Sequence, residues 1–277
     1  LPAAFAIPML AALAAVARSW ASEAANRTAV LAWFGGSALF FITLIFPIQF
    51  EKQWITVGWA LEGVALLWLF RRLPHPGLRG LGVALLVIAF VRLALNPAVL
   101  DYHPPSTTRI WNWYLYTYGI VTACAFAGAR LLAPPRHLLW GKSVPPLLYT
   151  LGTVLAFLLL NIEIADYFSE GAALTFQFSG SFAREMTSSI GWALFALALL
   201  VVGVGKHLRA VRYAGLALLG ITLLKLFLHD LLAIRALYRI GAFLGVAVIS
   251  ILASVLYQRF FASEPKPSGE HAGSASQ

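Results

Sequence analysis

Charged side chains are scarce in this sequence. Asp, Glu, Lys and Arg make up 11% of the 277 residues, 60% are hydrophobic, and the mean hydropathy is +0.81. An ordinary soluble domain is about 25% charged and about 45 to 50% apolar. A soluble core of this length cannot bury so much apolar surface, but a bilayer can, because each spanning helix needs about 20 mostly apolar residues. The composition therefore excludes a soluble globular protein.

Cysteine and the familiar catalytic signatures are also lacking. The single cysteine, Cys124, lies inside an apolar run, so it can form no internal disulfide and we expect it to be a packing residue. No Walker P-loop, H-E-x-x-H or G-x-S-x-G motif is present. His103 and His229 are single histidines in separate loops, which indicates neither a metal site nor a cofactor. The sequence does not settle whether the protein is an enzyme.

Long apolar runs dominate what is present. Nine runs are each long enough to cross a membrane, some with tilt: about 1–17, 28–49, 54–70, 79–96, 110–130, 144–165, 187–205, 211–229 and 238–260. The runs are continuously apolar and do not alternate as the strands of outer-membrane barrels do. The sequence therefore predicts an all-α, polytopic helical membrane bundle with about nine transmembrane helices.

The basic residues predict the orientation of this bundle. The net charge is +9, but the cations stand in short clusters between apolar runs, as in membrane proteins, so we expect no nucleic-acid partner. One set of helix ends, at 18–27, 71–79, 130–142, 206–212 and 259–266, holds 13 of the 20 Lys and Arg residues. By the positive-inside rule this side is cytoplasmic, and so is the C-terminus.

An internal repeat is visible in the sequence. Residues 58–95 align without a gap to residues 191–228, at a constant offset of 133, and both copies begin with GWAL, contain a basic turn and end near a cation. Each unit holds four spans, and an even number of spans returns the chain to the same side. The sequence therefore predicts a parallel four-helix internal repeat, related by an axis along the membrane normal.

Four segments follow from this pattern. Residues 1–27 contain the first span, which we interpret as the remnant of a longer upstream region. Residues 28–133 form repeat unit one and residues 134–261 form repeat unit two, with four spans each. Residues 262–277 are rich in Ser, Gly, Pro and Glu, and we expect a disordered cytoplasmic tail.

Three phrases of the sequence carry a family resemblance: GWALEGVALLWLFRR, IWNWYLYTYG and LYRIGAFLGVAVISILASVLYQRF. From about residue 50 to 261 the chain resembles the C-terminal part of the bacterial predicted membrane proteins grouped as domain of unknown function 2339. This resemblance implies a multi-pass topology in the bacterial inner (cytoplasmic) membrane, with further spans upstream. It supplies no catalytic residues.

Three ionisable residues lie within the expected spans: Glu62, Arg92 and Lys225. Such residues cost about 2.5 to 3.5 kcal/mol on insertion scales, so each requires a reason. Glu62 and Arg92 have similar estimated depths on consecutive helices, and we expect them to form an ion pair, either structural or functional. Lys225 occupies the repeat position of Arg92, and it either pairs with Glu163 or Asp166 or extends towards the surface.

Polar chemistry concentrates in the connections that we place outside. Carboxylates, histidines and arginines occur there among aromatic residues, which could bind a sugar, an anionic headgroup or a peptide. The alternative is an ordinary aromatic belt with solvated charges. The candidate substrate-binding residues are Asp101, His103, Arg109, Trp111, Trp113, Glu163, Asp166, His229, Asp230 and Arg235.

Three functions stay open. The first is binding and handling of an envelope lipid or glycan at the outer rim, as an enzyme or its subunit. The second is a scaffold for other membrane proteins, and the third is a small-molecule transporter whose halves rock about a site containing Glu62, Arg92 and Lys225. The inner halves of most spans are Leu, Ala and Gly, which disfavours transport. The expected partners are membrane lipids and, for a scaffold, other membrane proteins.

Overall fold

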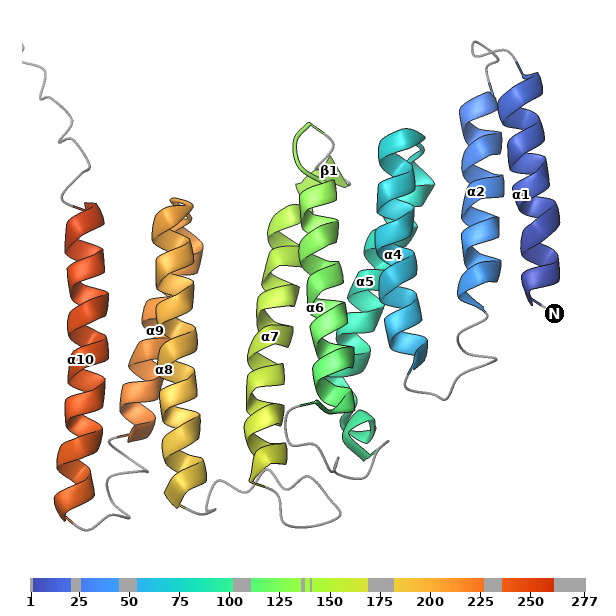
Figure 1. The fold of residues 1–277 in the computed structure, drawn as a ribbon. Helices are drawn as coiled ribbons and strands as arrows, with labels where there is room; N and C mark the ends of the chain where they lie inside the picture. Colours follow the sequence, from blue (N-terminus) through green and yellow to red (C-terminus); the bar gives the residue numbers. More distant parts are fainter. Residues whose placement is uncertain are drawn as a thin grey trace, which may run out of the picture. The chain divides into compact units, whose positions relative to one another are not determined.

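A computed structural model describes residues 2–20, 26–44, 54–101, 111–135, 138–139, 141–168, 182–226 and 236–261. These residues form nine α-helices, one 3₁₀ helix and one pair of very short strands (Figure 1). The elements are α1 (Pro2–Ser19), α2 (Arg27–Thr43), α4 (Trp54–Arg72), α5 (Pro76–Leu95), η1 (Pro97–Asp101), α6 (Trp113–Leu131), β1 (Leu138–Leu139), β2 (Lys142–Ser143), α7 (Pro145–Tyr167), α8 (Phe182–Gly205), α9 (Arg209–Lys225) and α10 (Ala236–Phe261).

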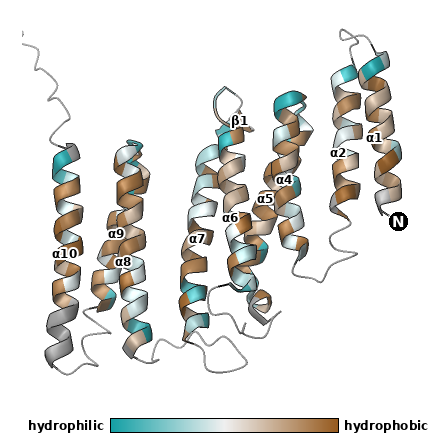
Figure 2. Ribbon diagram, in the orientation of Figure 1, coloured by the Kyte–Doolittle hydropathy of each residue, from teal (hydrophilic) through white to brown (hydrophobic). Residues whose placement is uncertain are grey.

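The helices follow the apolar runs of the sequence. Each of the nine predicted runs coincides with one described α-helix, and hydrophobic colour covers most of their length, with hydrophilic residues near several helix ends (Figure 2). Four helices, α4, α5, α7 and most of α8, are long and apolar enough to cross a membrane. The prediction of helices is thus confirmed, whereas a count of nine spans is not.

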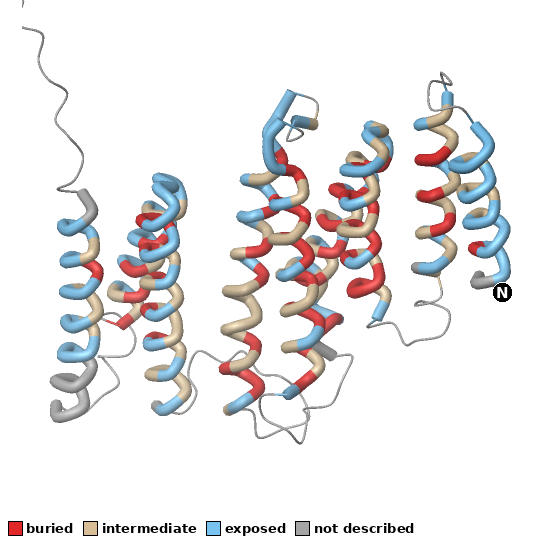
Figure 3. Tube along the Cα trace, turned by 45° about the horizontal axis from the view of Figure 1, so that its top comes forward, coloured by how far each residue is buried: buried red, intermediate tan, exposed pale blue. Residues whose placement is uncertain are grey.

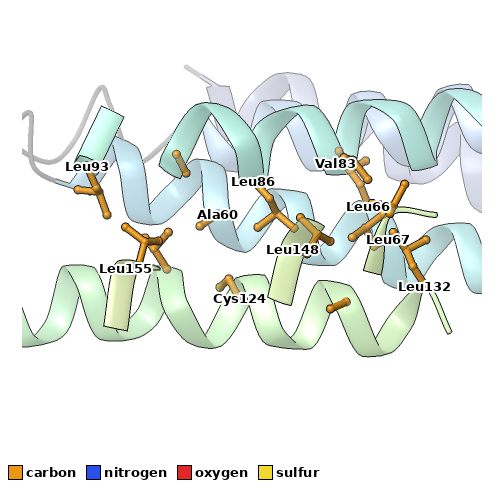
Figure 4. Packing of buried hydrophobic residues seen from close by; sticks show 14 of the residues in the cluster. Ala60, Leu66, Leu67, Val83, Leu86, Leu93, Cys124, Leu132, Leu148 and Leu155 are labelled. Carbon is orange, nitrogen blue, oxygen red and sulfur yellow. The ribbon is translucent and has the colours of Figure 1, made fainter. Parts of the chain in front are cut away.

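Two compact units divide the chain, residues 1–176 and residues 177–277. In the first unit α4, α5, α6 and α7 surround a continuous apolar core, and the buried positions of these helices face one another (Figure 3). Leu67 and Leu86 meet α6 at Gly128, where an added Cβ would lie 2.7 Å from Leu86 and 3.4 Å from Leu148 of α7 (Figure 4). Gly128 therefore lets α6 approach the other helices closely.

A close crossing fixes the register of the α4–α5 hairpin. A Cβ atom at Gly82 would lie 2.9 Å from the backbone oxygen of Gly63 and 2.9 Å from Leu67, and a Cβ atom at Gly63 would lie 2.9 Å from the oxygen of Gly82. The two backbones touch here because neither residue has a side chain. Three residues, 73–75, connect the helices, and Nδ1 of His75 accepts a hydrogen bond from the backbone N–H of Gly77 at 3.2 Å.

The α8–α9 hairpin of the second unit has an equivalent crossing. A Cβ atom at Gly215 would lie 2.9 Å from Leu200 and 3.0 Å from the backbone oxygen of Ala196. Gly215, Ala196 and Leu200 stand 133 positions after Gly82, Gly63 and Leu67, which make the same contact in the first unit. Three residues, 206–208, again form the turn. This agreement supports the internal repeat, which stays a prediction because the two units are not placed relative to one another.

Candidate functional site

The side chain of Asn112 lies between the start of α6 and the end of α7. Its Oδ1 accepts a hydrogen bond from the backbone N–H of Leu115 at 2.8 Å, which caps α6. Its Nδ2 donates to Oε2 of Glu163 at 3.0 Å and to Oδ2 of Asp166 at 2.9 Å. An asparagine amide has two N–H groups, so both are used on these carboxylates. Asn112 is 2% exposed, which places this junction inside the protein.

Glu163 and Asp166 are three residues apart on α7, and this spacing puts both side chains on one face of the helix. Asp166 is 7% exposed and Glu163 is partly buried. The start of α6 carries a partial positive charge, which favours the carboxylates, whereas the end of α7 carries a partial negative charge, which opposes them. The amide of Asn112 therefore supplies much of the local compensation.

Two carboxylate oxygens at this junction are buried without a hydrogen-bond partner in the part of the chain that the structure describes. They are Oε1 of Glu163 and Oδ1 of Asp166. A buried acceptor without a donor is costly, by about 1 to 3 kcal/mol and more for a charged group, and such groups in native proteins often mark a function. We call Asn112, Glu163 and Asp166 the acceptor cluster.

Aromatic residues lie beside the acceptor cluster. Trp111 is 67% exposed, with its ring centroid 6.2 Å from that of Tyr116. Tyr118, two residues after Tyr116 on α6, is buried, and its hydroxyl donates to the backbone oxygen of Leu93 on α5 at 2.9 Å. The start of α6 is thereby tied to the end of α5 as well as to the end of α7.

Arg92 lies at the same end of the first unit, three residues before the end of α5. Its guanidinium carbon lies 5.7 Å from the centroid of the Trp59 indole, a cation–π geometry. We expected Arg92 to form an ion pair with Glu62, but the structure places it against Trp59 instead. Glu62 is buried, as predicted. The Gly63–Gly82 crossing explains the difference. Arg92 is ten residues after Gly82, about 15 Å along the axis of α5, whereas Glu62 directly precedes Gly63 on α4. Because Gly63 and Gly82 touch, Glu62 and Arg92 lie at different levels of the hairpin.

Lys225 in the second unit has hydroxyl partners. Its Nζ donates to Oγ of Ser189 at 2.8 Å and to Oγ of Ser188 at 3.2 Å. Both serines lie on α8, so Lys225 joins the end of α9 to α8. The sequence analysis offered Glu163 or Asp166 as a partner of Lys225, or an extension towards the surface, and did not anticipate these serines.

The structure brings together only some of the predicted substrate-binding residues. Glu163 and Asp166 share a partner, and Trp111 and Trp113 stand beside that partner, at the start of α6. Asp101 is the last residue of η1. Five candidates lie outside the described residues: His103, Arg109, His229, Asp230 and Arg235.

Asn112 was not among the predicted site residues, although it joins two of them. Its local signal is an asparagine directly before a helical run, which is typical of a helix N-cap. That signal predicts the bond to Leu115 but not the bonds to carboxylates 51 and 54 positions away. Among the described residues, no three His, Cys, Asp or Glu side chains are arranged to hold a metal ion. The carboxylates of Glu163 and Asp166 can accept hydrogen bonds and can bind a cation.

Comparisons with known proteins place the chain in a family. No curated protein and no solved structure matches it. The model of the family described as "Predicted membrane protein (DUF2339)" matches residues 1–179 and residues 104–260. These matches cover most of the chain, so the protein belongs to the DUF2339 family of predicted membrane proteins.

Proposed function

We propose that this protein binds an envelope lipid or glycan at the outer face of the bacterial inner membrane, with the acceptor cluster contacting its hydroxyl or amino groups. The observation that carries the proposal is the pair of buried, unpartnered carboxylate oxygens, Oε1 of Glu163 and Oδ1 of Asp166. Hydroxyl and ammonium groups are the donors that such oxygens accept best, and charge-assisted hydrogen bonds of this kind are strong.

The arrangement of the cluster supports this proposal. The Asn112 amide donates to one oxygen of each carboxylate, Oε2 of Glu163 and Oδ2 of Asp166. It makes no hydrogen bond to the second oxygen of either carboxylate. Exposed Trp111 offers an apolar and aromatic surface next to the cluster, of the kind that packs on sugar rings or acyl chains. Glu163 as a whole residue is partly buried, but its unpartnered oxygen and that of Asp166 are both buried, so a ligand group must enter below the protein surface to contact them.

A scaffold is the second candidate, and one observation favours it. Asn112 joins the start of α6 to the end of α7, and a cluster that serves to rigidify this junction needs no ligand. Transport has less support, because the cluster lies at the helix ends and Glu62 and Arg92 do not form a shared site with it.

We also propose the predicted topology, with the turn at 73–75 and the C-terminus on the cytoplasmic side and the acceptor cluster outside. The clusters of Lys and Arg support this orientation. The parallel repeat belongs to the same proposal. Its support is the equivalent crossings at Gly82 and Gly215.

Copurification tests the proposed function. The intact protein, Glu163→Gln and Asp166→Asn are purified from membranes in mild detergent, and bound lipids and glycans are identified by mass spectrometry. The matched control is Glu185→Gln, the same change on the first turn of α8. A hydroxyl- or amine-rich species enriched with the wild type and the control, but lost from both cluster variants, supports the proposal. Equal recovery from all four proteins overturns it in favour of a scaffold.

A further inference from the structure

Arg92 and Lys225 stand at equivalent positions of the two hairpins, 133 residues apart, yet their surroundings differ. The ammonium group of Lys225 donates to two hydroxyls, those of Ser188 and Ser189. Oγ of Ser188 in turn donates to the backbone oxygen of Glu185 at 2.8 Å. Two serine hydroxyls of α8 therefore accept hydrogen bonds from the Lys225 ammonium, and these bonds tie the cation to its own hairpin.

The first hairpin lacks this arrangement. The positions equivalent to Ser188 and Ser189 are Ile55, which has no hydroxyl, and Thr56, which is buried as Ser189 is but is not the contact that the structure gives Arg92. Arg92 instead lies over the ring of Trp59, and its Nε is buried with no hydrogen-bond partner among the residues that the structure describes. A ring face attracts a cation but accepts none of its N–H bonds as a carboxylate or phosphate would.

The position of Arg92 gives it access to the membrane surface. It is three residues from the end of α5, about 4.5 Å along the axis, and its side chain stays partly exposed. Arginine near a helix end commonly reaches the headgroup level, where lipid phosphates lie. A tryptophan beside it is typical of the same level.

We propose that Arg92, braced by Trp59, binds the phosphate group of a membrane lipid. The planar guanidinium matches a phosphate with two parallel N–H···O bonds, which an aromatic ring cannot provide. In the equivalent copy, two serine hydroxyls of the protein accept hydrogen bonds from the charged group of Lys225. This site is separate from the acceptor cluster and does not depend on the function proposed for it.

Native mass spectrometry of the full chain tests the inference. The protein is released from nanodiscs of phosphatidylcholine containing a fixed fraction of phosphatidylglycerol, and retained phosphatidylglycerol is counted. Arg92→Gln is expected to lower retention roughly tenfold, the worth of one hydrogen-bonded charge. Arg92→Lys keeps the charge without the planar fork and is expected to lower retention roughly threefold. It also keeps the test decisive if Arg92→Gln does not fold.

Lys225→Gln is the matched control, because it removes the same charge from the equivalent position and keeps an amide donor for the two serines. Its retention is expected to equal that of the wild type. Equal losses in Arg92→Gln and Lys225→Gln, or wild-type retention in Arg92→Lys, would overturn the inference. Displacement of the lipid by millimolar inorganic phosphate would overturn the lipid assignment in favour of a free phosphate. A loss in Glu163→Gln as large as that in Arg92→Gln would assign the retained lipid to the acceptor cluster and would also overturn the inference.

Discussion

The side-chain amide of Asn112 donates to the carboxylate of Asp166 across 2.9 Å, and both residues are more than nine-tenths buried. This contact joins the residue before α6 to the last turn of α7. Asn112 therefore caps α6 and also binds the acidic face of α7. Two hydrogen bonds therefore hold the acceptor cluster on the side of Asn112, and the second oxygen of each carboxylate is not bonded to that amide.

Replacing Asn112 with Ala removes the helix cap and both donors at once. Loss of an N-cap costs about 0.5 to 2 kcal/mol, and each buried acceptor left without its donor costs about 1 to 3 kcal/mol. We expect a clear fall in the unfolding temperature of the detergent-solubilised protein. Asn161→Ala is the control, because the Asn161 amide donates within α7, to the backbone oxygen of Phe157. Equal unfolding temperatures for the two variants would show that the bridge contributes nothing.

Much of the fold was predictable from the sequence, since each apolar run became one helix. Contacts between helices were not. The Glu62–Arg92 pair was expected from estimated depth alone, but the register of the hairpin is set where Gly63 and Gly82 touch, and that register brings Arg92 to Trp59. Glu163 and Asp166 were recognised as candidates because acidic residues at a helix end are conspicuous. Their link to Asn112 depends on how α6 and α7 pack, which no local pattern encodes.

Glycine substitutions test the two crossings as a matched set. Gly82→Ala and Gly215→Ala place a Cβ within about 3 Å of the facing helix, and overpacking of this kind costs about 1 to 3 kcal/mol. Gly80→Ala and Gly220→Ala meet nothing within 4 Å, and they should be neutral or slightly stabilising, because Ala favours helix by about 1 kcal/mol over Gly. Thermal unfolding of the four variants measures this. Stable Gly215→Ala beside unstable Gly82→Ala would contradict equivalent hairpins.

Ser189→Ala probes the solvation of Lys225. The Ser189 hydroxyl is buried and accepts the shorter of the two hydrogen bonds from the ammonium, and a hydrogen bond to a charged group contributes about 1.5 to 3 kcal/mol. We expect less folded protein in the membrane and a lower unfolding temperature. Ser254→Ala is the control, because Ser254 is an exposed residue of α10 whose hydroxyl accepts a hydrogen bond from Gln258 at the surface. A destabilisation no larger than that of the control would assign Lys225 to the surface.

The proposed orientation is tested with single cysteines in a Cys124→Ala background. Ser143 lies in β2, in a connection that the proposal places on the cytoplasmic side, and Ser181 directly precedes α8 in the sequence, in a connection that the proposal places outside. A membrane-impermeant maleimide should label Ser181→Cys in cells with a permeable outer envelope, and Ser143→Cys only after the inner membrane is opened. The reverse pattern would invert the topology.

The most direct measurement for the acceptor cluster is an experimental structure of the full chain in nanodiscs of native lipid. The account predicts non-protein density within about 3 Å of Oε1 of Glu163 and Oδ1 of Asp166, with the shape of a sugar or a headgroup. That density should be absent from the Glu163→Gln structure. If both oxygens instead accept hydrogen bonds from protein groups, and no density lies beside Trp111, the cluster is a structural bridge and the proposed binding function is contradicted.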